Sequence, residues 1–65
     1  MNDSDYWTIR AMQDYGGGFV RALGAAAQQA DPKNLARLKA AWPEYWAKYE
    51  ALGKKLAAED AEAGA

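Results

Sequence analysis

The sequence predicts an all-α protein, and three observations support this fold class. Sixteen of the 65 residues are alanine, which is the best helix former. Residues that favour strands are almost absent, because the chain has one Ile, one Val and one Thr. Apolar residues recur at spacings of three and four in both halves of the chain, which is the period of one helical face. We therefore expect an antiparallel helical hairpin built from two long helices.

The first helix is expected over about residues 4–29. Ser4 or Asp3 can cap its N-terminus, and Asp5 lies in its first turn, where a carboxylate complements the helix dipole. The glycines at 16–18 oppose this interpretation, since each one costs roughly 0.8–1 kcal/mol relative to alanine in a helix. A loop at 16–18 is the alternative. The apolar spacing continues across the glycines, and this favours one helix.

The second helix is expected over about residues 32–58. Asp31 is a suitable N-cap, and Pro32 follows at the first helical position, where its missing N–H is not needed. Pro43 falls inside this helix, removes one backbone hydrogen bond and crowds the carbonyl of Lys39, so a kink is expected there. The alternative is a helix boundary at Pro43, which gives three helices. Residues 1–58 then form the domain, and residues 59–65 form an acidic, flexible tail.

The three-four spacing defines a predicted core seam along both helices. Its members are Ile9, Met12, Gly16, Phe19, Leu23, Leu35, Leu38, Trp42, Tyr45, Tyr49, Leu52 and Leu56. A short turn at 30–33 makes the two helices antiparallel neighbours, so positions whose numbers sum to 64 or 65 face each other. In this register Gly16 lies opposite Tyr49, and Phe19 lies opposite Tyr45.

A two-helix hairpin buries only one side, and small domains generally need additional support. The chain has no cysteine and therefore no disulfide, so we expect two hairpins to associate as a homodimeric four-helix bundle. Aromatic side chains outside the seam favour this idea, because Trp and Tyr are enriched at interfaces. The predicted interaction surface consists of Tyr6, Trp7, Tyr15, Trp46 and Lys48.

The composition argues against catalysis. The chain contains no histidine and no cysteine, so the usual general base and the commonest metal ligands are missing. Ser4 and Thr8 are the only residues of their kinds, and neither has a histidine partner for a hydrolase triad. The glycines at 16–18 lack the preceding strand and the Lys-Ser/Thr ending of a phosphate loop. We expect no enzyme, no cofactor and no metal.

The charge distribution leaves one alternative function open. Residues 32–58 hold six basic residues against two acidic ones, so a small nucleic-acid-associated protein is conceivable. These charges fall on several sides of the heptad, and the whole chain carries a net charge of −1, so a protein partner is preferred over nucleic acid. The longest uncharged stretch, 22–30, is far shorter than the about 20 apolar residues of a membrane span. With an acidic N-terminus and no signal-like segment, we expect a cytoplasmic protein without membrane association.

Several short motifs are spread over residues 5–53. They are Tyr6-Trp7, Tyr15-Gly16-Gly17 with Phe19, Ala30-Asp31-Pro32 and Trp42-Pro43-Glu44-Tyr45-Trp46. In this pattern the chain resembles small helical accessory proteins encoded by bacteriophages and prophages. Proteins of that kind with known roles often bind and inhibit host proteins, including CRISPR effectors and transcription or quorum-sensing regulators. The resemblance implies a partner-binding modulator in the host cytoplasm that acts by steric occlusion, and it assigns no functional residues. A structural or virion-assembly subunit remains the third possibility.

Overall fold

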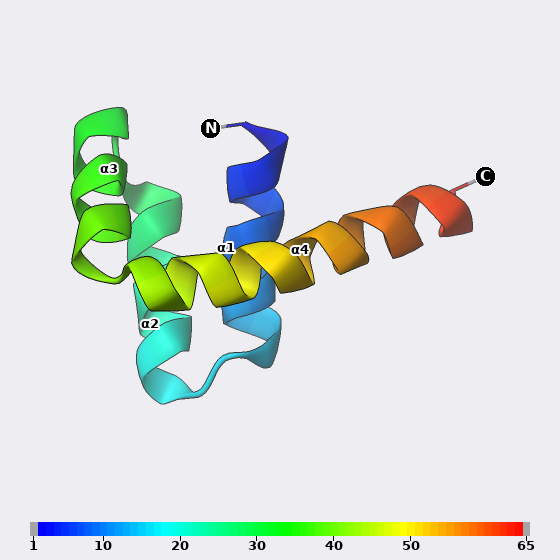
Figure 1. The fold of residues 1–65 in the computed structure, drawn as a ribbon, viewed down its shortest axis with the longest axis horizontal. Helices are drawn as coiled ribbons and strands as arrows, with labels where there is room; N and C mark the ends of the chain where they lie inside the picture. The colour runs from blue at the N-terminus through cyan, green and yellow to red at the C-terminus, as the bar shows by residue number, and fades with distance from the viewer. Residues whose placement is uncertain (1, 65) are drawn as a thin grey trace.

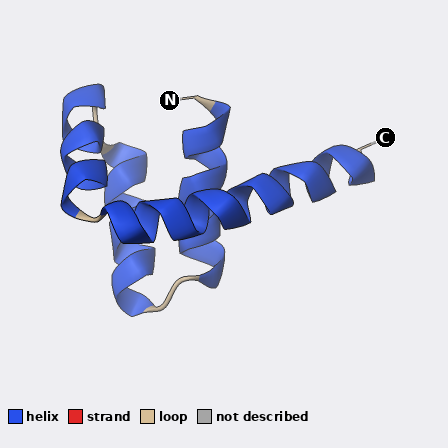
Figure 2. Ribbon diagram, in the orientation of Figure 1, coloured by secondary structure: helices blue, strands red, loops and turns tan. Residues whose placement is uncertain are grey.

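In the computed structural model, which describes residues 2–64, the chain folds into four helices (Figures 1 and 2). Helix α1 spans Asp3–Tyr15, α2 spans Gly18–Gln29, α3 spans Pro32–Ala41 and α4 spans Pro43–Ala63. No strand occurs between residues 2 and 64. The all-α fold class is confirmed. The hairpin of two long helices is wrong, because each of the expected helices is divided in two.

Gly16 and Gly17 separate α1 from α2. Both residues have extended backbone, with φ −77° and ψ 156° at Gly16 and φ −73° and ψ −174° at Gly17. The poor helix propensity of consecutive glycines therefore outweighs the apolar spacing that runs through them. The chain reverses at this point, and α2 packs beside α1 (Figure 1). Gly24 lies at this contact, where a Cβ atom would be 2.9 Å from the Cβ of Met12.

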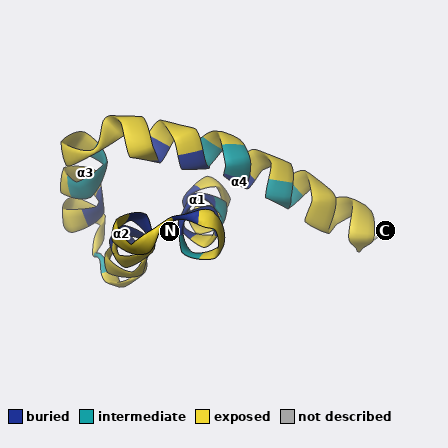
Figure 3. Ribbon diagram, turned by 90° about the horizontal axis from the view of Figure 1, so that it is seen from below, coloured by how far each residue is buried: buried dark blue, intermediate teal, exposed yellow. Residues whose placement is uncertain are grey.

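Pro43 marks a helix boundary rather than a kink. A proline disfavours helical backbone at the residue before it, and Trp42 accordingly has φ −131° and ψ 63°. The N–H of Trp42 donates to the carbonyl of Leu38 at 3.1 Å, and the carbonyl of Trp42 accepts from the N–H of Trp46 at 3.1 Å. Trp42 thus joins α3 to α4 at a corner. From this corner α4 crosses α1, and its last turns extend past α1 to Ala63 instead of ending near residue 58 (Figures 1 and 3).

The two helix starts that the sequence specified have different outcomes. Helix α1 is capped by Asn2, whose Oδ1 accepts from the N–H of Asp5 at 2.8 Å, so the expected cap at Ser4 or Asp3 is wrong. Helix α3 begins as predicted, because the Asp31 side chain accepts from the N–H of Asn34 at 2.9 Å.

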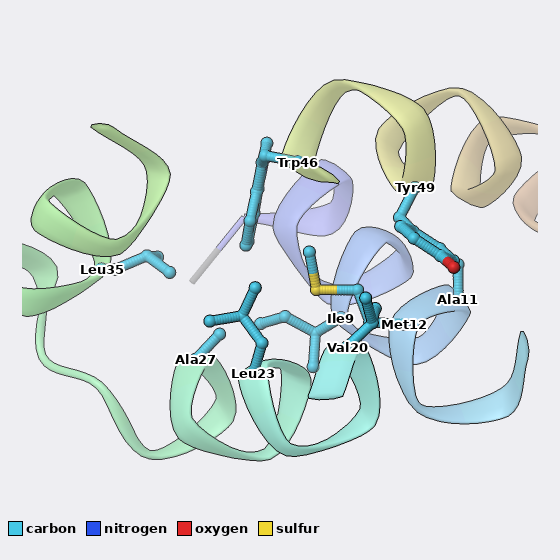
Figure 4. Close-up of a cluster of buried hydrophobic side chains, with 9 residues drawn as sticks. All are labelled: Ile9, Ala11, Met12, Val20, Leu23, Ala27, Leu35, Trp46 and Tyr49. Carbon is cyan, nitrogen blue, oxygen red and sulfur yellow. The ribbon is translucent and has the colours of Figure 1, made fainter. Parts of the chain in front are cut away.

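All four helices contribute to one hydrophobic core (Figure 4). Its buried members are Ile9, Ala11, Met12, Val20, Leu23, Ala27, Leu35, Trp46 and Tyr49. The predicted seam supplies many of the core contacts: Ile9, Met12, Gly16, Leu23, Leu35 and Tyr49 are buried, and Leu38, Leu52 and Leu56 are partly buried.

Three seam residues were assigned wrongly. Phe19, Trp42 and Tyr45 are 53%, 39% and 40% exposed. Trp46, which was predicted to lie on the interaction surface, is only 6% exposed and belongs to the core. The predicted seam assumed one continuous helix, whereas the chain turns a corner at Trp42, and in the first turns of α4 Trp46 rather than Tyr45 faces the core.

The crossing of α4 over α1 occurs at Gly53, where the two backbones approach each other. A Cβ atom at Gly53 would lie 2.8 Å from the backbone carbonyl carbon and oxygen of Trp7 and 3.0 Å from the amide nitrogen of Thr8. Thr8 is fully buried, and its hydroxyl donates to the carbonyl of Ser4 at 2.7 Å. Its polar group is therefore satisfied within α1. Gly16 has a different role from the one expected, since the nearest atoms to a Cβ there belong to Met12 and Val20 rather than to Tyr49.

Candidate interaction surface

Three exposed aromatic residues gather where α2, α3 and α4 meet. Phe19 comes from the first turn of α2, Trp42 is the corner residue and Tyr45 lies in the first turn of α4. The ring centroids of Phe19 and Trp42 are 5.8 Å apart at an interplanar angle of 67°, and those of Phe19 and Tyr45 are 5.7 Å apart at 55°. Both arrangements are in the range of favourable aromatic pairs. We refer to Phe19, Trp42 and Tyr45 as the corner cluster.

The corner cluster confirms one pair of the predicted register and explains why its members are exposed. Phe19 and Tyr45 do face each other, as the hairpin register required. They meet at the rim of the core, because α2 begins at Gly18 and α4 begins at Pro43, so neither helix continues beyond them to cover the rings. Large apolar groups grouped on a surface often mark a binding site.

A small pocket adjoins the corner cluster. It has a volume of about 220 Å³ and is lined by Ala41, Trp42, Pro43, Glu44 and Tyr45. Glu44 lies in the first turn of α4, where its negative charge is stabilised by the helix dipole. The site therefore combines aromatic rings with an acidic group.

The predicted surface residues Tyr6 and Trp7 lie together on α1, whereas Trp46 is buried in the core. Their rings are T-shaped, with centroids 5.2 Å apart at 88°. Arg10 joins them: its Nη1 donates to the Tyr6 hydroxyl at 3.1 Å, and its guanidinium carbon lies 5.8 Å from the Trp7 ring centroid. The hydrogen bond that Arg10 donates to the Tyr6 hydroxyl, together with the Asp14 carboxylate, raises the pKa of Arg10 above its ordinary value.

The other two predicted surface residues occupy separate places. Tyr15 is 62% exposed at the end of α1 and lines a depression of about 290 Å³ that also includes Trp7 and Leu56. Lys48 is exposed, and its ammonium nitrogen lies 5.5 Å from the ring centroid of Tyr49. The five predicted residues therefore do not form one continuous surface, since Trp46 is in the core.

A polar contact missed by the sequence reasoning holds α3 against the other helices. Asp5 is only 6% exposed, and its Oδ1 lies 2.8 Å from the Nζ of Lys39. The same Nζ lies 5.0 Å from the ring centroid of Trp46. Lys39 thus links the first turn of α1 to α3 and α4. Because the partners are 34 residues apart, only the tertiary structure brings them together.

Replacing Asp5 with asparagine is expected to lower the free energy of unfolding by about 1–2 kcal/mol, because Lys39 loses its charged partner. Asp3→Asn is the matched control, since Asp3 lies in the same helical turn but is exposed. Asp3→Asn should lower the free energy of unfolding only by the lost interaction with the helix dipole, about 0.3–1 kcal/mol. Urea unfolding followed by circular dichroism measures both. Equal losses in the two variants would show that the Asp5–Lys39 pair adds no stability.

The basic residues of the second half do not form one stripe. Lys33, Arg37 and Lys39 lie on α3, whereas Lys48, Lys54 and Lys55 lie on α4, beyond the corner at Pro43. Lys39 is already paired with Asp5.

Within residues 2–64 no three acidic residues are grouped closely enough to hold a metal ion. In the same span no helix has the length and apolar character needed to cross a membrane.

The sequence placed Trp46 on the surface and the three residues of the corner cluster in the core, and the structure reverses both assignments. Pro43 is the feature of the sequence that could have indicated the corner. A proline disfavours helical backbone at the residue before it, so the spacing of apolar residues cannot be counted through it as one helix. A comparison with protein-family models, curated proteins and solved structures finds no match to this chain.

Proposed function

We propose that this protein is a non-enzymatic protein-interaction module that binds its partner through the corner cluster. The observation that carries the proposal is the grouping of three large aromatic rings, 39–53% exposed, at one corner of a small fold. Trp and Tyr are the residues most enriched at the energetic centres of protein interfaces. Their rings bury a large area while losing few rotamers, so binding carries a small entropic cost.

The mechanism we propose is steric occlusion. The corner cluster is built from three helices, two of which meet at the proline-fixed backbone of Trp42, so its rings are presented on a preorganised surface. A partner that covers these rings has its own surface blocked by the helices around them. This activity suits a phage-encoded modulator of a host protein in the host cytoplasm, the role suggested by the resemblance.

The same surface also accommodates self-association as a homodimer. The structure supplies each chain with a four-helix core of its own, so dimerisation is no longer required to complete the core. The exposed rings of the corner cluster would lose apolar surface to the partner copy in such a dimer.

Photo-crosslinking tests the proposal directly. Benzoylphenylalanine is introduced at position 45, within the corner cluster, and separately at exposed position 26 on α2 as the matched control. Irradiation of expressing cells is expected to give a discrete protein adduct from position 45 and none from position 26. An adduct near twice 7.1 kDa identifies a second copy, and a larger one identifies a foreign protein. No protein adduct at position 45, or equal adducts at both positions, contradicts the proposal.

The nucleic-acid alternative makes a different prediction. Counterion release would make binding to nucleic acid fall steeply with salt, whereas an aromatic protein interface depends only weakly on salt. The division of the basic residues between α3 and α4 favours the protein partner.

A further inference from the structure

We propose that the corner cluster and Glu44 together receive an arginine side chain presented by the protein partner. This inference rests on the proposed function and deepens it by naming the chemistry that the partner brings. It commits to a guanidinium group because two independent features of the corner, its uncovered rings and its acidic neighbour, favour a cation.

The first feature is the pairing of cations with aromatic rings in residues 2–64: three of the five rings outside the corner cluster have a cation over them, whereas Tyr6 and Tyr15 have none. Arg10 lies over Trp7 at 5.8 Å, Lys39 over Trp46 at 5.0 Å and Lys48 over Tyr49 at 5.5 Å. Each of these rings has a cation from the chain itself, attracted by the negative face of the ring. In the part of the chain that the structure describes, the rings of the corner cluster take part in no such pair. The ring faces that Phe19, Trp42 and Tyr45 do not turn toward one another therefore carry no cation from the chain itself.

The second feature is the acidic pocket at the same corner. Glu44 lines the pocket of about 220 Å³ together with Trp42 and Tyr45. This volume is below the roughly 300–1,000 Å³ of small-molecule sites, and it is better matched to one side chain than to a whole ligand. A cation in the pocket is attracted by the carboxylate and by the rings at once.

Arginine fits this combination better than lysine. Its guanidinium is planar and weakly hydrated, so it stacks on aromatic rings while two of its N–H groups donate to one carboxylate. An ammonium group is more strongly hydrated and offers no planar fork.

The probe for this inference is the capped tripeptide acetyl-Gly-Arg-Gly-amide. Its matched control is the same peptide with citrulline, which keeps the shape of arginine but has no charge. Both are titrated into the full chain while ¹H–¹⁵N spectra are recorded, with the indole N–H signal of Trp42 assigned from the Trp42→Phe variant. The arginine peptide is expected to change the chemical shifts of the Trp42 indole N–H and of the Tyr45 backbone amide. The citrulline peptide should leave both chemical shifts unchanged.

Two carboxylate variants test the role of Glu44. Glu44→Gln should lower the affinity of the protein for the arginine peptide by about two- to fivefold. Glu59→Gln, which removes one negative charge from the far end of α4, should leave the affinity at the corner unchanged. Equal shifts with citrulline, shifts confined to the acidic residues at 59–62, or an unchanged affinity in Glu44→Gln would each overturn the inference.

The two proposals fail separately. If position 45 crosslinks to a protein but the arginine peptide gives no shift at Trp42, the interaction module stands and the arginine pocket is wrong. If position 45 gives no protein adduct, the interaction module itself is wrong, whatever the peptide does.

Discussion

Replacing Trp46 with alanine is expected to lower the free energy of unfolding by about 3–5 kcal/mol. Trp46 is 6% exposed and packs in the core, and its ring also carries the contact with Lys39 (Figure 4). Natural domains have only about 0.05–0.15 kcal/mol of stability per residue, which is about 3–10 kcal/mol for 65 residues, so a loss of this size removes a large part of the stability of the fold. Circular dichroism in urea measures the effect.

Trp42→Ala is the matched control, because it removes the same side chain four positions earlier. Trp42 is 39% exposed and contacts Phe19 at the rim of the core, so the expected loss is about 1 kcal/mol. The sequence seam made the opposite assignment, with Trp42 inside and Trp46 outside. A larger loss at Trp42 than at Trp46 would restore that assignment and contradict the structure. Because Trp42→Ala should remain folded, it is also the variant of choice for binding experiments on the corner cluster.

Replacing Gly53 with alanine is expected to destabilise the protein by about 1–3 kcal/mol. The added Cβ would lie 2.8 Å from the backbone of Trp7, and backbone atoms give way only if the two helices separate. The loss runs against helix propensity, which by itself favours alanine over glycine by about 0.8–1 kcal/mol. A fall in the free energy of unfolding on Gly53→Ala therefore indicates that α1 and α4 cross closely at this residue, and a rise indicates that they do not.

Gly18→Ala is the matched control for this glycine. It lies in the first position of α2, and no atom lies within 4 Å of a Cβ built there. The substitution should stabilise the protein by about 0.4–1 kcal/mol, because alanine restricts the unfolded chain. Thermal unfolding of the two variants beside the parent protein measures both signs. A stabilised Gly53→Ala variant would mean that α4 does not touch α1 at this point.

Local chemistry explains what the sequence predicted correctly. The all-α class follows from the alanine content and the near absence of β-branched residues, which act residue by residue. The start of α3 follows from Asp31 and Pro32, because a cap satisfies backbone groups only a few positions away. Ile9 and Met12 were assigned to the core because both lie on one apolar face of α1, before the glycines end that helix, and Leu23 lies on the apolar face of α2.

The errors in the predicted core arose where that phase was interrupted. Pro43 takes Trp42 out of the helix and starts α4 in a new orientation, so Trp46 rather than Tyr45 turns toward the core. Tyr49, Leu52 and Leu56, farther along α4, keep their predicted places. Phe19 lies in the first turn of α2, directly after the glycine break, and its ring is exposed at the rim of the core beside Tyr45. The corner cluster is a product of this rearrangement.

Alanine-rich composition, capping residues and periodicity by themselves determined that this chain is helical and where one of its helices begins. Only the tertiary structure decided that Trp46 rather than Trp42 is buried, that Gly53 permits the crossing of two backbones, and that Asp5 meets Lys39. The physical reason is that helix formation depends on neighbours within one turn, whereas helix packing depends on atoms far apart in the chain.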